Sequence, residues 1–235
     1  MTVEILGEAN ASRARRGALA GVAVALVAGA IAAPTAGAQG TGSPELLARN
    51  AQVVGRSYTE WDVEWGKRST TRLRSTRALV TTGPNRCGVQ IGNARLLPAS
   101  IEGRITARCT IPPGTFLVFP VTGYVAGGEQ RDALAAEVRQ GFRAIERAEL
   151  TVDGQKLRKP GQLVTTPAYR VTLRRGNPLD VPPGRLWLQS RDYFAILSPP
   201  GPGRHVIETL GVVRPPGERR FELGMTYRLT VAAAS

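Results

Sequence analysis

Two stretches of the chain repeat their hydrophobic residues with the period of an α-helix. In residues 44–66 the apolar and aromatic side chains recur three, four or seven positions apart, which places them on one face of a helix that Gly66 can end. In residues 129–149 a second apolar stripe covers about 80° of arc at about 100° per residue. Its members are Leu134, Val138, Phe142 and Ile145. The pattern predicts an N-terminal aromatic helix and an amphipathic helix inserted later.

The remaining chain alternates apolar and polar residues over short runs, which is typical of β-strands. Such runs occupy 78–82, 94–98, 104–110, 115–121, 149–152, 155–157, 168–174, 185–190, 193–197, 205–213 and 225–232. Clusters of Pro and Gly separate many of them, and Asp153-Gly154 is a favoured hairpin turn. We therefore predict a mainly β fold: a single β-sandwich-like domain, immunoglobulin-like or jelly-roll-like, with the two helices added.

The N-terminal segment has the pattern of an export signal. Arginines at positions 13, 15 and 16 precede an uninterrupted apolar run over 18–33, and Pro34 follows it. As a helix this run spans about 24 Å, which is shorter than the ~30 Å hydrocarbon core of a bilayer. The segment is therefore read as a signal peptide and not as a membrane anchor. The adjacent arginines leave both the twin-arginine and the general export route open.

The cleavage site is predicted just after this run. Ala36 and Ala38 are small residues two positions apart, as a signal peptidase requires, so the mature chain would begin at Gln39. The predicted organisation is a signal peptide over 1–38, a flexible leader over 39–44 and a single β-rich domain over 45–235. No transmembrane span is expected in the mature chain. We expect a protein that is secreted or held in the cell envelope or periplasm.

Export determines how the two cysteines are interpreted. Cys87 and Cys109 are the only cysteines in the sequence. An even number of cysteines in an oxidising compartment indicates a disulfide bond. The alternative is a catalytic thiol, but it would leave the second cysteine unexplained and would need His205, the single histidine, as its base.

Composition excludes several classes of protein. The chain has 235 residues, 42% of them hydrophobic, with 31 Lys and Arg against 18 Asp and Glu and a formal net charge of +13. The apolar fraction is too high for a disordered chain, and the length suits one domain. One histidine and two cysteines exclude almost every zinc site, and the common nucleotide-binding and hydrolase motifs are missing. We expect no metal and no cofactor.

The positive charge is concentrated in two places. Lys67, Arg68 and three further arginines lie within 67–77, and Arg139, Arg143 and Arg147 are predicted to form a ridge on the helix face opposite its apolar stripe. In an exported protein such charge favours anionic envelope polymers, phospholipid head groups or nucleic acid as weak partners. No motif for specific nucleic-acid recognition is present. The alternative is a solvated face that complements the helix dipole.

Aromatic residues offer a second candidate ligand surface. Tyr58, Trp61 and Trp65 form a stripe on the first helix. Exposed rings of this kind stack on sugars or bases, whereas buried ones attach a helix to a sheet, and we favour the buried arrangement. Asp192 and Tyr193 are further candidates, because they lie side by side within a predicted strand.

Carboxylates are the remaining candidate chemistry, because a pair of acids can hydrolyse a glycan without a histidine. Glu60 and Glu64 lie four positions apart, as on a solvated helix face, with Asp62 between them. Asp192 follows Arg191 in a strand, so the two side chains point to opposite faces and Asp192 faces either the core or a cleft. We expect Asp192 to form a buried salt bridge with an arginine.

The order of motifs along the mature chain resembles that of a known family. The motifs are the aromatic helix at 58–65, Cys87 with Gln90 and Gly92, Arg108-Cys109-Thr110-Ile111-Pro112-Pro113-Gly114-Thr115, Phe119-Pro120-Val121, Leu150-Thr151-Val152-Asp153-Gly154, Asp192-Tyr193, Pro202-Gly203-Arg204-His205-Val206-Ile207 and Tyr227-Arg228-Leu229-Thr230-Val231. In this order they resemble a family of secreted bacterial proteins that has no established activity. The resemblance covers nearly all of the mature chain and supports the predicted fold and location.

The chain departs from this family in two places. Members tend to have a Trp-Phe-Leu run where this chain has Leu96-Leu97-Pro98. They also tend to have an Asn and an acidic residue or Cys where this chain has Thr122-Gly123-Tyr124. If that second region were a ligand site, it would be lost or altered here.

Together these patterns predict an exported, non-enzymatic binding or structural module that contacts an anionic polymer or glycan through an arginine-rich surface. The alternative is a secreted glycan hydrolase that uses carboxylates.

Overall fold

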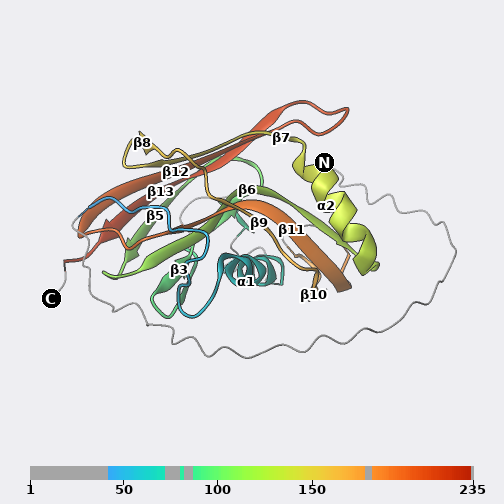
Figure 1. Cartoon of the computed structure of the whole chain (residues 1–235), viewed down its shortest axis with the longest axis horizontal. Helices are drawn as coiled ribbons and strands as arrows, with labels where there is room; N and C mark the ends of the chain where they lie inside the picture. Colours follow the sequence, from blue (N-terminus) through green and yellow to red (C-terminus); the bar gives the residue numbers. More distant parts are fainter. Residues whose placement is uncertain (1–41, 72–79, 82–86, 178–181, 234–235) are drawn as a thin grey trace, which may run out of the picture. The chain divides into compact units, whose positions relative to one another are not determined.

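Two β-sheets packed against each other form the centre of the domain in the computed structural model (Figure 1). The structure describes residues 42–71, 80–81, 87–177 and 182–233, all of which belong to one compact unit. The predicted mainly β, sandwich-like fold with two short helices is confirmed. The predicted cleavage site at Ala36, Ala38 and Gln39 lies outside the described residues.

The larger sheet has six strands in the order β10-β11-β6-β3-β2, with β9 also paired to β11. Their bounds are β2 (Val89–Ile91), β3 (Ala94–Leu96), β6 (Phe116–Gly128), β9 (Gln162–Thr165), β10 (Tyr169–Leu173) and β11 (Gly184–Leu197). Strand β3 pairs with β6 only as far as Val118. Beyond that residue, β6 has no partner on this side among the described strands. We call this side of β6 its free edge.

The smaller sheet has five strands in the order β5-β13-β12-β7-β8. Their bounds are β5 (Gly103–Ile111), β7 (Ile145–Val152), β8 (Gln155–Lys156), β12 (Gly203–Val213) and β13 (Phe221–Val231). Strands β5 and β13 are parallel, and the other pairs are antiparallel. Strands β1 (Val80–Thr81) and β4 (Ala99–Ser100) form a separate, two-stranded parallel sheet.

The main core lies between the two sheets. Alternate residues of β13 and β6 face inward, so Tyr227 and Phe119 stack with ring centroids 5.4 Å apart. Tyr227 is fully buried, and its hydroxyl donates a hydrogen bond to the Pro98 carbonyl at 2.5 Å. The polar end of this large side chain is therefore satisfied inside the core.

The first helix, α1 (Tyr58–Thr70), covers the other face of the larger sheet. Ser57 and Glu60 form a capping box at its start, so the helix begins there and not near residue 44 as predicted. Trp61 is 0% exposed and its indole N–H donates to the Val53 carbonyl at 2.9 Å. Tyr58 and Trp61 thus belong to a second hydrophobic core, as the buried arrangement predicts, and Trp65 is partly buried beside it.

The second helix is shorter than predicted. A 3₁₀ turn, η1 (Arg131–Ala133), leads into α2 (Leu134–Phe142), and the following residues form β7. Leu134 and Val138 are buried as expected, but Ile145 lies on a strand. The prediction of a helix over 129–149 was wrong because 145–152 pair with β12, a long-range contact that the local pattern does not reveal. Of the helices that the structure describes, none is long and apolar enough to span a membrane.

The structure confirms one further local prediction, a hairpin, and corrects another, a pair of strands. The Asp153-Gly154 hairpin is confirmed, with φ of 48° and 80° at the two turn residues, as a primed hairpin turn requires. The two strands predicted at 185–190 and 193–197 are one strand, β11, which bulges between Tyr193 and Phe194. Of the strand predicted at 78–82, only 80–81 lies within the described residues.

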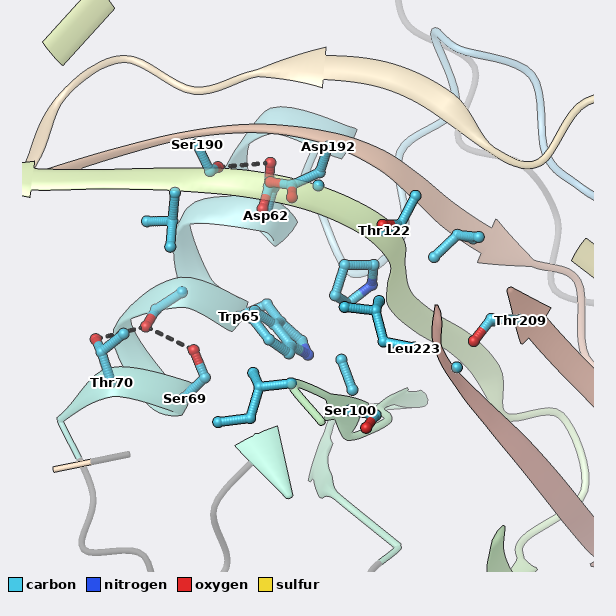
Figure 2. A pocket seen from close by; sticks show the side chains of 18 of the residues that line it. Asp62, Trp65, Ser69, Thr70, Ser100, Thr122, Ser190, Asp192, Thr209 and Leu223 are labelled. Carbon is cyan, nitrogen blue, oxygen red and sulfur yellow. Dashed lines mark hydrogen bonds between the residues drawn. The ribbon is translucent and has the colours of Figure 1, made fainter. Parts of the chain in front are cut away.

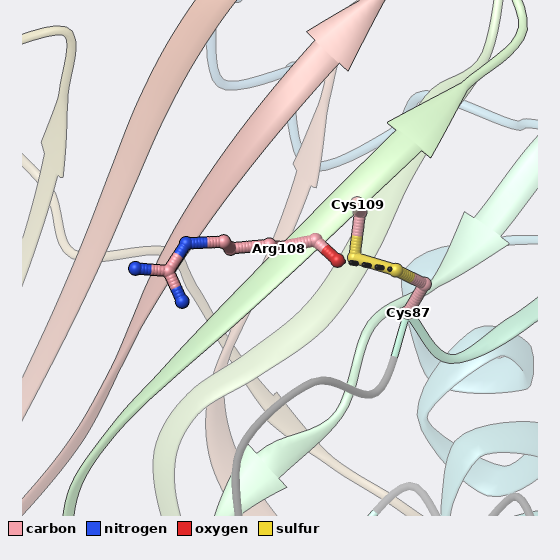
Figure 3. The surroundings of a disulfide bond; sticks show 3 residues. All are labelled: Cys87, Arg108 and Cys109. Carbon is pink, nitrogen blue, oxygen red and sulfur yellow. Dashed lines mark hydrogen bonds between the residues drawn. A yellow bond between two sulfur atoms is a disulfide. The ribbon is translucent and has the colours of Figure 1, made fainter.

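The predicted disulfide is present (Figure 3). Cys109 lies on β5 and points into the main core, and Cys87 lies just before β2. Their Cα atoms are 5.3 Å apart, within the usual range for a disulfide. Because β5 and β2 belong to different sheets, the bond covalently ties one side of the sandwich to the other.

Candidate functional site: a pocket beside a buried carboxyl pair

A pocket of about 230 Å³ lies where α1 meets the free edge of β6 (Figure 2). Its walls come from α1, β4, β6 and β13, with contributions from β10, β11 and β12. The larger apolar residues that line it are Trp65, Ile101, Val121, Val125, Phe221 and Leu223. Ile101 and Val125 expose 42% and 41% of their surface, so the apolar wall continues to the molecular surface.

Two aspartates form a polar wall of this pocket. Asp62 comes from α1 and Asp192 from β11, and their carboxyl groups are hydrogen-bonded to each other. Ser190, also on β11, donates from its hydroxyl to Asp62 Oδ2 at 3.1 Å. Asp62 is 2% exposed and Asp192 9% exposed. The structure therefore joins two acids that lie far apart in the sequence.

Burial keeps this pair protonated. Loss of solvation raises the pKa of Asp62 well above its ordinary value, the negative charge of Asp192 raises it further, and the Ser190 hydrogen bond opposes the rise. Burial also raises the pKa of Asp192 to about 7, against the lowering effect of its hydrogen bonds to Ser190 and Asp62. At neutral pH the pair thus retains at least one proton, which one carboxyl donates to the other.

Two glycines make room for polar groups of the site, Gly123 for Asp192 and Gly66 for Tyr169. Gly123 lies directly opposite Asp192 in the β6–β11 register, and a Cβ at that glycine would lie 1.5 Å from Asp192 Oδ1. Gly66 lies one turn after Asp62, and a Cβ there would lie 2.0 Å from the Tyr169 hydroxyl. Burial raises the pKa of the Tyr169 phenol, and the charges of both aspartates raise it further. Any larger residue at either glycine would displace a polar group of the site.

One pocket hydroxyl has no partner among the described residues. Thr122 is 4% exposed, and its Oγ1 makes no hydrogen bond there. By contrast, Thr209 Oγ1 accepts from the Met225 N–H at 2.9 Å, and the Thr70 hydroxyl donates to the Gly66 carbonyl at 2.7 Å. Of the departure at Thr122-Gly123-Tyr124 noted in the sequence, Thr122 and Gly123 line this pocket, whereas Tyr124 packs with the cluster under α2.

The expectation that Asp192 pairs with an arginine was wrong. Its partner is Asp62, and Arg191 points to the opposite face of the sheet, where its guanidinium lies 5.1 Å from the Phe142 ring centroid. Tyr193 also lies on that face, 5.4 Å from Phe142 between ring centroids. Asp192 and Tyr193 therefore do not share one site.

The aromatic candidates Trp61 and Trp65 also lie in two different environments. Trp61 is enclosed in the core and offers no ligand surface. Trp65 lines the pocket and donates its indole N–H to the Leu97 carbonyl at 2.9 Å. The pairing of Asp62 was not predicted from the sequence. One signal was present: Asp62 follows Trp61 and lies four positions after Tyr58, which places an acid on the apolar face of the helix.

The predicted arginine ridge does not exist as a helix face. Arg139 is on α2, Arg143 follows the helix end, and Arg147 is on β7, where it forms an ion pair with Glu149. The three side chains are exposed, but they do not line one side of one element. Of the basic stretch over 67–77, only 67–71 lie within the described residues.

A different group of arginines shares one surface. Arg104 and Arg108 on β5, Arg228 on β13 and Arg204 on β12 are exposed and alternate with the buried positions of their strands. Figure 3 shows the Arg108 side chain directed away from the disulfide in the core. None of the four side chains has a hydrogen bond or ion pair with any residue that the structure describes. We call this group the arginine face.

His205 is hydrogen-bonded through both ring nitrogens. Its Nδ1 lies 2.8 Å from Asp153 Oδ2 and its Nε2 lies 2.9 Å from the Gly201 carbonyl oxygen. Asp153 also accepts a hydrogen bond from the Val206 N–H at 2.8 Å. These contacts join the β7–β8 turn to the start of β12. Within the described parts of the chain, no three His, Cys, Asp or Glu residues are grouped as metal ligands.

Comparisons with known proteins give only distant similarities. No protein-family model and no curated protein matches the chain. A structure of PbICP-C in complex with falcipain-2 is 12% identical, covers 60% of this chain and 99% of its own, and has a TM-score of 0.26. The solution structure of amebosin is 12% identical, with coverages of 55% and 97% and a TM-score of 0.15. These values assign the chain to no family.

Proposed function

We propose that the protein is an exported, non-enzymatic binding module that holds an anionic envelope polymer on its arginine face. The observation that carries this proposal is four exposed arginines on three adjacent strands with no acidic partner among the described residues. Arg108 and Arg228 are directly opposite in the β5–β13 register. Neighbouring strands lie about 4.8 Å apart, and like charges directly opposite each other destabilise a sheet. An anionic partner removes that repulsion.

The surroundings of these arginines suit a polymer with repeated acidic groups. Arg204 lies opposite Thr230, which in turn lies opposite Thr110, so hydroxyl groups extend the surface between the arginines. Guanidinium groups bind carboxylate and phosphate oxygens through paired hydrogen bonds. Two acids also lie on this face of the sheet, Glu208 on β12 and Glu222 on β13. Glu208 accepts a hydrogen bond from the Thr226 hydroxyl at 3.4 Å.

Glycan hydrolysis, the alternative function, is less well supported by the carboxyl pair. Retaining glycosidases separate their two carboxyl groups by about 5–5.5 Å and inverting ones by about 6.5–9.5 Å. Asp62 and Asp192 are instead in direct hydrogen-bond contact. A sugar ring or an attacking water does not fit between them in that arrangement, so binding is the function that the geometry favours.

Removal of the arginine face should abolish most of the polymer binding. We expect the variant with Arg104, Arg108, Arg204 and Arg228 replaced by Gln to bind polygalacturonate at least tenfold more weakly than the wild type at low salt. Binding of the wild type should itself weaken steeply towards physiological salt, because exposed charges are screened over about 8–10 Å. Isothermal titration calorimetry at two salt concentrations measures both effects.

A matched control has the same loss of charge elsewhere. Arg139, Arg143, Arg174 and Arg175 are exposed and have no described partner, so their joint replacement by Gln lowers the net charge equally. This variant should retain most of the affinity. An equal loss in both variants would show that only the overall charge matters and would contradict a defined arginine face.

The export part of the proposal has its own test. The pattern of residues 13–38 predicts a mature N-terminus at Gln39. Intact-mass spectrometry of protein recovered from the medium or envelope should find the species that begins there. A full-length species that retains Met1 in those fractions would contradict cleavage at this site.

A further inference from the structure

The arginine face has one position at which two arginines meet. Arg108 on β5 and Arg228 on β13 occupy the same register position of two parallel strands, and both are exposed. Side chains at one register position of neighbouring parallel strands lie on the same face of the sheet, about 4.8 Å apart. The other two members stand singly, since Arg104 lies opposite a glycine and Arg204 lies opposite a threonine. The Arg108–Arg228 pair is therefore the densest positive charge on this face.

No acid that the structure describes compensates this pair. Neither arginine side chain forms a hydrogen bond or an ion pair with a described residue. The residue beside Arg228 on β12 is Val206, which has no charge. Glu208 lies one row away and accepts a hydrogen bond from Thr226, and Glu222 lies farther away along β13. Like charges directly opposite each other destabilise a sheet, so the free protein retains a repulsion that a bound anion relieves.

Threonines flank the pair on both sides. Thr106 lies opposite Thr226 one row before the pair, and Thr110 lies opposite Thr230 one row after it. Successive rows on one face of a strand are about 6.6 Å apart. The hydroxyls of Thr106, Thr110 and Thr230 have no partner among the described residues, and each can both donate and accept hydrogen bonds, as sugar hydroxyls do. A glycan is therefore suited to lie across these rows.

The amount of negative charge distinguishes the anions that such a glycan can carry. A carboxylate or a sulfate ester has a single negative charge, whereas a phosphate monoester has a charge of about −1.5 to −2 at neutral pH and three acceptor oxygens. Two guanidinium groups supply two positive charges and several N–H donors arranged to bind such oxygens in pairs. Of these anions, the phosphate monoester matches both the charge and the donors of the pair.

We propose that the Arg108–Arg228 pair is a subsite for phosphate monoester groups on a glycan, with the two guanidinium groups on the phosphate oxygens and the flanking threonines on neighbouring sugar hydroxyls. This inference rests on the proposed function, because it names the acidic group that the arginine face recognises. Arg104 and Arg204 attract any anionic polymer by charge, but as single arginines they do not distinguish one anion from another.

The test compares derivatives of one glycan, dextran, that differ in the attached anion. We expect the protein to bind dextran phosphate at least tenfold more tightly than carboxymethyl-dextran with the same number of substituents, at pH 8 and physiological salt. Dextran sulfate with twice as many substituents matches the total charge of the phosphate and should still bind more weakly. Calorimetry measures the affinities. Equal affinity for the phosphate and the charge-matched sulfate would overturn the subsite and leave the proposed function intact, whereas no binding of any derivative, even at low salt, would overturn both.

The ionisation of the ligand gives an independent readout, because the second pKa of a phosphate monoester is about 6. Dextran phosphate should bind about fivefold more weakly at pH 5 than at pH 8, since most of its groups then carry a single charge. Dextran sulfate does not titrate in this range and corrects for any titration of the protein. The charged side chains nearest to the pair on the flanking strands are Arg104, Arg204, Glu208 and Glu222. A ratio of the two affinities that does not change with pH would contradict a doubly charged phosphate as the ligand.

Variants separate the pair from the charge of the whole face. Arg108→Gln/Arg228→Gln should bind the phosphate and the charge-matched sulfate with affinities that differ less than twofold. Arg104→Gln/Arg204→Gln removes the same charge from the same face and is the matched control, which should weaken binding of every derivative but keep the preference for phosphate. Arg108→Lys/Arg228→Lys keeps the charge but loses the planar donor forks, so it should lose most of the preference while it still binds the sulfate. All four arginines are exposed, so folding should not be affected. A preference that survives in Arg108→Gln/Arg228→Gln, or that is lost equally in the control, would overturn the subsite.

Discussion

Raising the pH from 5 to 8 is expected to reduce the stability of the protein by about 2–4 kcal/mol through the Asp62–Asp192 pair. Burial raises the pKa of Asp192 to about 7 in the folded state, whereas an unfolded aspartate titrates near pH 4. Between these values the folded protein binds more protons than the unfolded chain. Stability is therefore greatest below about pH 4 for this group and is lost as the pH rises to about 7. Asp62 acts in the same direction, because burial raises its pKa as well.

Urea unfolding at several pH values measures this effect, and Asp192→Asn isolates it. The amide keeps the size of the side chain but does not ionise, so the variant should lose less stability than the wild type between pH 5 and 8, and the loss that remains is the contribution of Asp62. The comparison is needed because other acids contribute at lower pH. Hydrogen bonds from Arg147 and Lys156, for example, lower the pKa of the partly exposed Glu149 to about 2, so its contribution to stability is nearly complete by about pH 5 and changes little above it. Parallel profiles for wild type and variant would show that the pair does not control the pH dependence.

Removal of the Cys87–Cys109 disulfide is expected to cost about 3 kcal/mol of unfolding free energy. The bond closes a loop between cysteines 22 positions apart, and the entropy that this removes from the unfolded chain gives that magnitude. The bond also connects β5 to the segment before β2, which belong to different sheets. For a domain of this size, Tm should fall by roughly 6–12 °C.

Thermal unfolding with and without reductant measures the loss. The Cys87→Ala/Cys109→Ala variant should unfold at about the temperature of the reduced wild type, and reductant should have no further effect on it. Mass spectrometry after thiol labelling of the native oxidised protein should detect no free thiol. Two labelled cysteines, or an unchanged Tm after reduction, would contradict a stabilising disulfide.

Much of the fold could be predicted because its signals are local. Alternation in β13 places Met225, Tyr227, Leu229 and Val231 on one face, and all four are buried in the main core. The Asp153-Gly154 turn is equally local, since its two residues tolerate positive φ and match the twist of a hairpin. The disulfide followed from the number of cysteines and the expected compartment alone.

Predictions failed where long-range pairing overruled a local pattern. Residues 145–149 continue the helical spacing of Leu134, Val138 and Phe142, yet they form β7 because β12 offers them a hydrogen-bonding partner in the smaller sheet. Arg147 belongs to this strand and is therefore not on the helix face where the ridge was predicted. The arginine face was hidden in the sequence, since its members come from three strands that meet only through the β5–β13–β12 register.

The sequence by itself determined most of the long strands, the presence of the aromatic helix, the hairpin turn and the disulfide, because each depends on side-chain period, turn chemistry or composition. Only the tertiary structure decided the carboxyl pair. Asp62 meets Ser190, 128 positions away, because α1 packs on the face of the larger sheet where β11 presents Ser190 and Asp192. Burial raises the pKa of both acids, so the pair retains a proton and avoids the repulsion of two negative charges. No sequence pattern encodes which distant side chains will share one buried space.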